Sequence, residues 1–198
     1  MARDDGPRKI VEDLVSRVPP LDEQERRDQA DILAWVRSGA PLFRTLPPMT
    51  PPQHLAVYFA LFDEANRALM LVDHVKAGCW LLPGGHVDDG EDPRDTVVRE
   101  AREELGIDVG FHERFGHRPF FLSVTQTRGQ HSHTDVTFWF VLRGDRAQAM
   151  TPDPGEFRGT AWFGLDEPVD WAAAHFDPHM ARFVDKLSAA LVTSASAR

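Results

Sequence analysis

The sequence predicts an α/β protein, an α/β/α sandwich built on a mixed sheet, with a helical extension at its N-terminal end. Three observations predict this fold class. Apolar runs rich in β-branched and aromatic residues are separated by turn signals, two well-capped helices flank these runs, and a Pro-rich stretch divides them from a first segment with helical periodicity. The 198 residues suffice for one domain with a sizeable core plus this appendage.

Residues 1–45 form the predicted helical extension. Residues 7–18 place apolar side chains on one helical face, and the prolines that follow stop this helix. Asp22 is a suitable N-cap for a second helix that runs toward Gly39. So short a hairpin cannot bury its apolar faces alone. Two interpretations are therefore open: a packing appendage, or an element that forms a homodimer or closes as a lid.

The predicted boundary is residues 46–52, LPPMTPP, a connector that is stiff because it is rich in proline. We expect the main domain over residues 53–192 and a disordered tail over residues 193–198. The strands of the main domain are predicted, in order, for residues 54–62, 68–72, 78–82, 109–118 (with a turn), 119–127, 135–142 and 160–164.

Two of the later elements have clear signals. Residues 135–142 are apolar on both faces, which is typical of a central strand. The final helix is expected to begin with Asp177 as its cap and Pro178 at its first position, and it carries an apolar stripe along one face.

The helix between Asp92 and Gly106 would be a poor helix without a ligand. Asp92 is a good N-cap, Pro93 suits the first helical position, and Gly106 supplies the left-handed residue that ends a helix. Like charges at i, i+4 destabilise a helix by roughly 0.2–0.5 kcal/mol per pair. Acidic side chains crowded beside the apolar face of the helix indicate that they bind a hard cation, Mg²⁺ or Mn²⁺. The alternative is that they form a solvated acidic face on a surface helix. The three carboxylates at i, i+3 and i+4 are Glu100, Glu103 and Glu104.

The segment before this helix favours the metal interpretation. Residues 82–85, LPGG, follow apolar residues and predict a tight backbone loop leading out of a strand. Glu91 stands eight residues before Arg99, so an acid–base pair is available to brace this loop against the helix.

Residues 85–107 match the Nudix box, G-x5-E-x7-R-E-U-x-E-E-x-G-U with U a bulky apolar residue, and on these residues the chain resembles the Nudix hydrolases. Ala101 at the first U position is smaller than usual, and Ile107 occupies the last. The resemblance implies the Nudix fold and the hydrolysis of a nucleoside diphosphate linked to another moiety. The matched fixed positions are Gly85, Glu91, Arg99, Glu100, Glu103, Glu104 and Gly106.

The resemblance also implies a role for each of these residues. Glu100, Glu103 and Glu104 would be the ligands of Mg²⁺, or of Mn²⁺, with the Gly85 carbonyl oxygen as a further ligand. Arg99 and Glu91 would support catalysis by bracing the loop against the helix. The general base differs among family members, and Glu103 is our choice.

Residues outside the box complete the predicted site. Family members often draw a further carboxylate from elsewhere, and Glu156 is the first candidate, with a surface loop acid as the alternative interpretation. Asp135 is the second candidate, and it is also expected to contact the substrate. His86 follows the glycine pair and is expected either to contact a substrate phosphate or to be an exposed loop residue. His131 and His133, at i, i+2 with Asp135 following, have a spacing suited to a metal, although two solvated histidines are the alternative.

Composition excludes several functional classes. The formal net charge of -9 argues against a nucleic-acid polymer as partner, because phosphate backbones are held by clustered Lys and Arg. Cys79 is the only cysteine, so an intramolecular disulfide and a multi-cysteine metal site are excluded. The N-terminal residues lack an apolar signal region, and the longest apolar run is far too short to span a membrane. We therefore expect a cytoplasmic protein.

The substrate is less well determined than the chemistry. Marks that distinguish several Nudix subfamilies are absent or do not match, so a nucleoside triphosphate, including modified ones, is the leading expectation by elimination. A nucleotide-sugar or ADP-ribose-type pyrophosphatase is the alternative enzyme. A non-catalytic nucleotide-binding module is the alternative of another class, although such modules usually lose box carboxylates and this chain retains them all.

Overall fold

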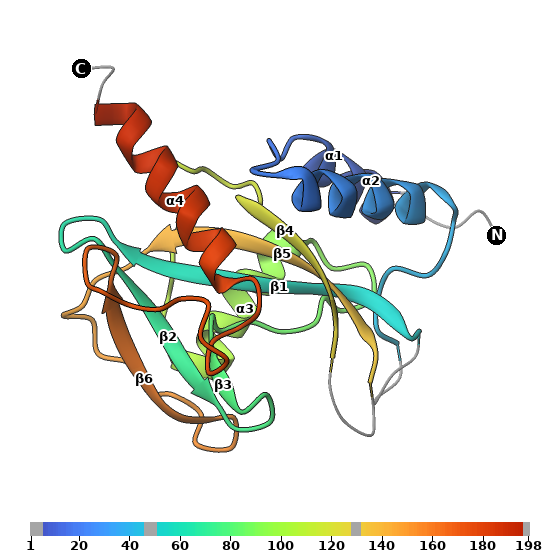
Figure 1. Cartoon of the computed structure of the whole chain (residues 1–198). Helices are drawn as coiled ribbons and strands as arrows, with labels where there is room; N and C mark the ends of the chain where they lie inside the picture. The colour runs from blue at the N-terminus through green and yellow to red at the C-terminus, as the bar shows by residue number, and fades with distance from the viewer. Residues whose placement is uncertain (1–5, 46–50, 128–131, 196–198) are drawn as a thin grey trace.

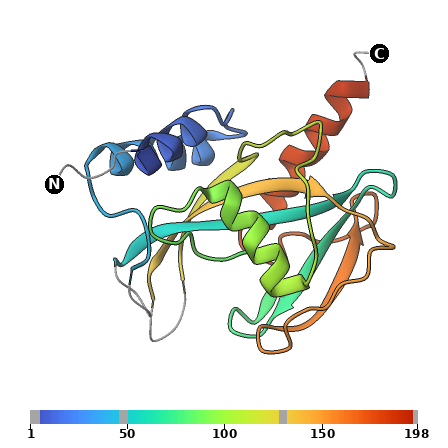
Figure 2. The same ribbon diagram turned by 180° about the vertical axis from the view of Figure 1, so that it is seen from behind.

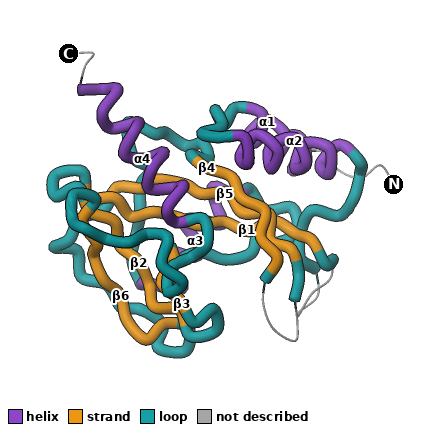
Figure 3. Tube along the Cα trace, viewed as in Figure 1, coloured by secondary structure: helices purple, strands orange, loops and turns teal. Residues whose placement is uncertain are grey.

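The computed structural model describes residues 6–45, 51–127 and 132–195, which form one sheet and four helices within these ranges (Figures 1 and 3). The sheet has the strand order β3-β2-β1-β5-β4, and β6 also pairs with β2. Only the β1·β5 pair is parallel, so the predicted mixed sheet is confirmed. The strands are β1 (Gln53–Asp63), β2 (Ala68–His74), β3 (Cys79–Leu81), β4 (Phe121–Gln126), β5 (Thr134–Arg143) and β6 (Phe157–Gly164).

The two central strands, β1 and β5, align over ten residue pairs from Gln53↔Thr134 to Phe62↔Arg143. Both are apolar on both faces, because both faces are covered by helices. Helix α3 (Pro93–Leu105) lies on one face and α4 (Met180–Ala195) on the other, as the front and rear views show (Figures 1 and 2). The expected α/β/α arrangement is therefore present.

Each sheet face has its own apolar core. On one face, β1 residues such as Val57 and Phe59 pack with Val97 and Leu105 of α3. On the other face, Trp139 of β5 packs with Phe183 and other residues of α4, and the two rings lie 5.1 Å apart. Alternation along the strands divides the side chains between these two cores.

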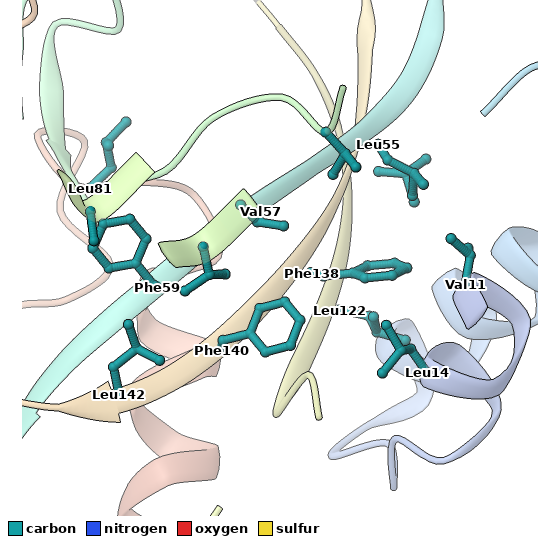
Figure 4. Packing of buried hydrophobic residues seen from close by; sticks show 14 of the residues in the cluster. Val11, Leu14, Leu55, Val57, Phe59, Leu81, Leu122, Phe138, Phe140 and Leu142 are labelled. Atoms are coloured by element: carbon teal, nitrogen blue, oxygen red, sulfur yellow. The ribbon is translucent and has the colours of Figure 1, made fainter. Parts of the chain in front are cut away.

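The N-terminal helices α1 (Gly6–Ser16) and α2 (Glu23–Arg37) extend the first core. Their apolar residues cluster with side chains of β1, β4 and β5, and Figure 4 shows Val11 and Leu14 beside Leu122 and Phe138. Val11 is fully buried and Leu14 is 3% exposed. The chain itself thus covers the apolar faces that the hairpin could not bury alone.

A buried polar contact docks these helices onto the sheet and α4. The carboxylate of Glu25, which is fully buried, accepts hydrogen bonds from Lys186 Nζ at 2.7 Å and from the backbone N–H of Leu122 on the edge strand β4 at 3.2 Å. Asp22, confirmed as the N-cap of α2, also receives two hydrogen bonds from Arg182 of α4. Glu25 therefore satisfies an edge N–H that would otherwise be open to another strand.

Three predicted elements differ in detail. Residues 109–118 form no strand, because Phe111 makes a single bridge to Leu142 before the chain turns at 113–117. Helix α4 begins at Met180, two residues later than predicted, since the Asp177 carboxylate accepts from the backbone N–H of His179 and caps a turn there. Residues 193–195 of the expected disordered tail belong to α4, whereas 196–198 and most of the predicted connector lie outside the described residues.

Across the described ranges, none of the helices has both the length and the apolar character needed to cross a membrane.

Candidate functional site: a carboxylate cluster against a glycine loop

Helix α3 has the caps that the sequence predicts. The Asp92 side chain accepts from the backbone N–H of Arg94, Pro93 lies in the first turn, and Gly106 ends the helix with φ of 65°. Helix α3 packs its apolar side, including Val97 and Leu105, against the sheet, which fixes the rotation of the helix and the direction of its carboxylates.

The three box carboxylates differ in their surroundings. Glu100 is 9% and Glu104 is 5% exposed, whereas the side chain of Glu103 is 60% exposed. Burial raises the pKa of Glu100, although the Arg99 guanidinium opposes this effect. Glu100 and Glu104 therefore form the inner part of the cluster, and Glu103 lies at its rim.

Arg99 holds the loop and the helix together, as its predicted bracing role requires. Its Nε and Nη2 each donate to a different oxygen of Glu91 at 3.0 Å, and its Nη2 also donates to the carbonyl oxygen of His86 at 3.1 Å. Its Nη1 reaches Glu100 at 2.8 Å and Glu103 at 3.1 Å. A bidentate guanidinium–carboxylate pair fixes geometry as well as charge. Burial opposes the ionised form of Glu91, but hydrogen bonds from Arg99 and Thr96 hold its pKa below its ordinary value.

The loop that follows β3, residues 82–86 (the glycine loop), lies in direct contact with these carboxylates. The backbone N–H of Gly84 donates to Glu104 Oε2 at 2.9 Å, and a Cβ added at Gly85 would lie 2.2 Å from Glu100 Oε1. The Gly85 carbonyl oxygen accepts from the N–H of Val57 on β1, which leaves one of its lone pairs for another ligand. Only a residue without a side chain allows this approach at position 85.

Glu156 comes from outside the box and joins the cluster. Its carboxyl group lies close to those of Glu104 and Glu100, and its side chain is 37% exposed. Burial, followed by the charges of Glu100 and Glu156, raises the pKa of Glu104 to about 9. Three carboxylates and a backbone carbonyl form an oxygen-only donor set, although Arg99 contacts Glu100 and Lys76 lies 3.8 Å from Glu156. Such a donor set fits a hard divalent cation.

A second cluster surrounds Asp135, the other predicted carboxylate. The Nε2 atoms of His86, His133 and His54 lie 3.3, 3.2 and 3.6 Å from Asp135 Oδ1. The structure thus places the side chains of His86 and Asp135 together, and among the described residues neither side chain hydrogen-bonds to Glu100, Glu103 or Glu104. His131 lies outside the described residues.

His54 is the member of this second cluster that sequence reasoning missed. It lies on β1 opposite Asp135 on β5 and is fully buried, and burial lowers the pKa of its imidazole. A polar residue at the start of an otherwise apolar strand is the signal that points to it.

The comparisons with known proteins agree with this fold and this box. A family model described as NUDIX domain matches residues 52–187. The chain therefore belongs to the Nudix family of hydrolases, whose members act on nucleoside diphosphate derivatives.

Particular relatives cover the chain to different extents. The chain is 26% identical to the RNA pyrophosphohydrolase of Cereibacter sphaeroides over 166 residues, which is 70% of this chain and 99% of that protein. It is 46% identical to the uncharacterized Nudix hydrolase YvcI of Bacillus subtilis over 44 residues, which is 22% of this chain and only 28% of YvcI. A NUDIX-family hydrolase of Clostridium perfringens has a similar fold, with a TM-score of 0.52, 20% identity, and coverage of 69% of this chain and 97% of that one.

Proposed function

We propose that this protein is a Mg²⁺-dependent hydrolase that cleaves the pyrophosphate linkage of a nucleoside diphosphate derivative, with a nucleoside triphosphate, including modified ones, as the leading substrate. The observation that carries the proposal is the pair of buried carboxylates, Glu100 and Glu104, held against the glycine loop with the half-buried Glu156 beside them. Mn²⁺ is an alternative to Mg²⁺, because both accept oxygen ligands.

The residues divide into ligands and supports. Glu100, Glu104 and Glu156 would hold the cation, with the remaining lone pair of the Gly85 carbonyl oxygen as a further ligand. Arg99 and Glu91 keep the loop and α3 at the distance that this site needs. A bound divalent cation would screen the phosphate charges and acidify a water molecule.

Glu103 is suited to a different task. Its side chain is 60% exposed and contacts Arg99, so it is accessible to a substrate and to water. We propose it as the general base or as a ligand for a further cation that enters with the substrate phosphates.

The substrate class follows from charge as well as from the family. A net charge of -9 disfavours binding along a polynucleotide, whereas a cation between protein and phosphates lets an acidic protein bind a nucleotide. Nucleotide sugars and ADP-ribose are the alternative substrates. Because one relative is named RNA pyrophosphohydrolase, a short RNA with a 5′ triphosphate belongs among the compounds tested.

The experiment is a hydrolysis assay with Mg²⁺ and nucleoside triphosphates, nucleotide sugars, ADP-ribose, dinucleotides and the short RNA, with products separated by chromatography. We expect turnover of one class in the wild-type protein and none in Glu104→Gln, with Glu113→Gln as a surface control. Glu113 is 73% exposed and pairs only with Arg143 among the ion pairs of the described residues. Tight binding of one class without turnover in the wild-type protein would favour the non-catalytic module instead.

A further inference from the structure

Three histidines converge on one carboxylate at the end of the sheet where β1 and β5 begin. The four side chains come from separate places: His54 from β1, His86 from the glycine loop, His133 from the segment before β5, and Asp135 from β5. One ligand atom of each lies within 4.8 Å of all the others. None of them is a hydrogen-bonding partner of Glu100, Glu103 or Glu104 in the proposed catalytic site.

The distances match a small tetrahedral cation. With metal–ligand distances of about 2.0–2.1 Å, two ligands of a tetrahedral Zn²⁺ are about 3.3–3.4 Å apart. The three Nε2–Oδ1 distances are 3.2, 3.3 and 3.6 Å. The three edges that join Asp135 to the histidines therefore have nearly the length that such a tetrahedron requires, and the remaining ligand atoms lie within 4.8 Å of one another.

The hydrogen bonds behind the imidazole rings orient them for metal binding. His54 Nδ1 lies 2.8 Å from the carbonyl oxygen of Pro51, which accepts only, so Nδ1 carries the proton and Nε2 presents a lone pair. His133 Nδ1 lies 3.2 Å from the hydroxyl oxygen of Thr127, a contact that holds this ring with its Nε2 toward Asp135. An outer partner of this kind is typical of histidines that bind metals.

Without a cation, hydrogen-bond acceptors face each other in this cluster. The lone pair of His54 Nε2 faces Asp135 Oδ1, itself an acceptor, and neither atom has a hydrogen-bond partner within the described part of the chain. His86 Nε2 is also buried without a hydrogen bond of acceptable geometry among the described residues. Buried polar atoms are seldom left in this state, because each has lost its hydrogen bonds to water without gaining a partner.

We propose that His54, His86, His133 and Asp135 form a second metal site, which binds Zn²⁺ and is chemically distinct from the oxygen-only Mg²⁺ site. Imidazole is a good ligand for Zn²⁺ and a poor one for Mg²⁺. Four protein ligands leave no open position, which makes the site structural. The assignment replaces the substrate contacts expected of His86 and Asp135, and it extends the predicted metal role of His133.

A cation at this position would fasten four segments of the chain together. It would fix the start of β1 to the start of β5 and to the glycine loop after β3. The same loop residue, His86, accepts a hydrogen bond from Arg99 through its carbonyl oxygen. The Zn²⁺ site would thereby stabilise the loop on which the proposed catalytic carboxylates pack.

The test is metal binding to chelator-treated full-length protein, measured with Zn²⁺ by elemental analysis and with Co²⁺ by its visible spectrum, in excess Mg²⁺ to occupy the carboxylate site. The variants are Asp135→Asn and His133→Gln, with His117→Gln, an exposed histidine outside the cluster, as the matched control. His54 is left unchanged because it is fully buried. Circular dichroism establishes that each variant is folded.

We expect one Zn²⁺ per chain, a tetrahedral Co²⁺ spectrum, and a rise in melting temperature of about 5–10 °C with Zn²⁺ well above its dissociation constant. Asp135→Asn and His133→Gln should weaken binding by about 100-fold or more, whereas Thr127→Val should weaken it by about 10-fold, as for outer partners. His117→Gln should bind like the wild type. Glu104→Gln should also retain Zn²⁺, which separates this site from the proposed catalytic one.

Three results would overturn the proposal. One is a wild-type protein that binds no Zn²⁺ under these conditions. Another is Zn²⁺ binding of wild-type affinity in both Asp135→Asn and His133→Gln. The third is loss of Zn²⁺ in Glu104→Gln, which would place the ion among the glutamates.

Discussion

Glu104, on α3, and Glu156, in the segment just before β6, bring their carboxyl groups together from distant parts of the chain. Burial of Glu104, followed by the charges of Glu100 and Glu156, raises its pKa to about 9. In the metal-free protein, Glu104 therefore holds a proton at neutral pH, at the position where we propose that Mg²⁺ binds. Binding of Mg²⁺ should displace this proton.

Our first prediction concerns Glu104→Gln in the metal-free protein. The pKa of Glu104 is about 9 in the folded state against an ordinary 4.5, so the folded protein retains a proton that the unfolded chain releases within this window. The free energy of unfolding should therefore fall as pH rises from about 4.5 to 9. Glutamine mimics the protonated acid, so the variant should be more stable than wild type at pH 8 in chelator, by at least about 1 kcal/mol, or about 2–4 °C.

Thermal unfolding at pH 5 and at pH 8 measures this effect. The gain should be small at pH 5, where the wild-type group is also protonated, and Mg²⁺ should stabilise only the wild type. A Glu104→Gln variant that is less stable than wild type at both pH values would contradict the raised pKa.

The second prediction concerns Gly85→Ala. A Cβ at this position would lie 2.2 Å from Glu100 Oε1, so the Glu100 carboxylate must move. We expect a folded protein whose hydrolysis rate falls about 100-fold, because small displacements of catalytic groups are costly. Gly159→Ala is the control, since an added Cβ there meets nothing within 4 Å. Equal rates for the two variants would show that this close approach is unimportant.

Arg99→Ala is expected to lower both stability and rate. The change removes hydrogen bonds to Glu91, Glu100, Glu103 and the His86 carbonyl oxygen, and we expect a loss of about 2 kcal/mol in stability. The rate should fall about 10–100-fold, because the loop is no longer fixed to α3. Arg102→Ala removes only an exposed ion pair with Asp108 and should change neither quantity by much. An unchanged melting temperature for Arg99→Ala would argue against the bracing role.

Lys186→Met tests the docking of the N-terminal helices. Lys186 is 7% exposed, burial lowers its pKa despite the pairing with Glu25, and its removal leaves the fully buried Glu25 with backbone donors alone. We expect a loss of about 3 kcal/mol, measured by denaturant unfolding, because an uncompensated buried charge is costly. The exposed Lys9→Met should cost little. A double variant, Glu25→Gln with Lys186→Met, should recover part of the loss.

Local signals predicted the parts of the fold that they control. The caps Asp92 and Gly106 set the limits of α3, and apolar residues on both faces of 135–142 marked a central strand. Within residues 109–118 the predicted turn is present at 113–117, around Gly116 with φ of 68°, but the predicted strand is absent because Phe111 makes only a single bridge before this turn. The packing of α1 and α2 against the sheet depends on residues that are distant in the sequence, such as Leu14 and Phe138, and no local pattern specifies it.

The glutamate cluster and the cluster around Asp135 were likewise predicted only as far as local sequence determines them. The spacing of Glu100, Glu103 and Glu104 identified the box, but it did not show that Glu103 is exposed while the other two are buried. The contact between Glu104 and Glu156 depends on how the segment before β6 packs. His54 reaches Asp135 only because β1 and β5 are parallel neighbours in one register, which sequence periodicity does not determine.

The most direct test of the proposed site is the Mg²⁺ dependence of hydrolysis in wild type, Glu156→Gln and Glu113→Gln, with whichever nucleotide the wild type turns over. We predict no turnover in chelator, saturation with Mg²⁺ in the wild type and in Glu113→Gln, and a requirement for about 10-fold more Mg²⁺ in Glu156→Gln, as loss of one ligand implies. Turnover in chelator, or identical Mg²⁺ curves for wild type and Glu156→Gln, would contradict a cation held jointly by Glu100, Glu104 and Glu156.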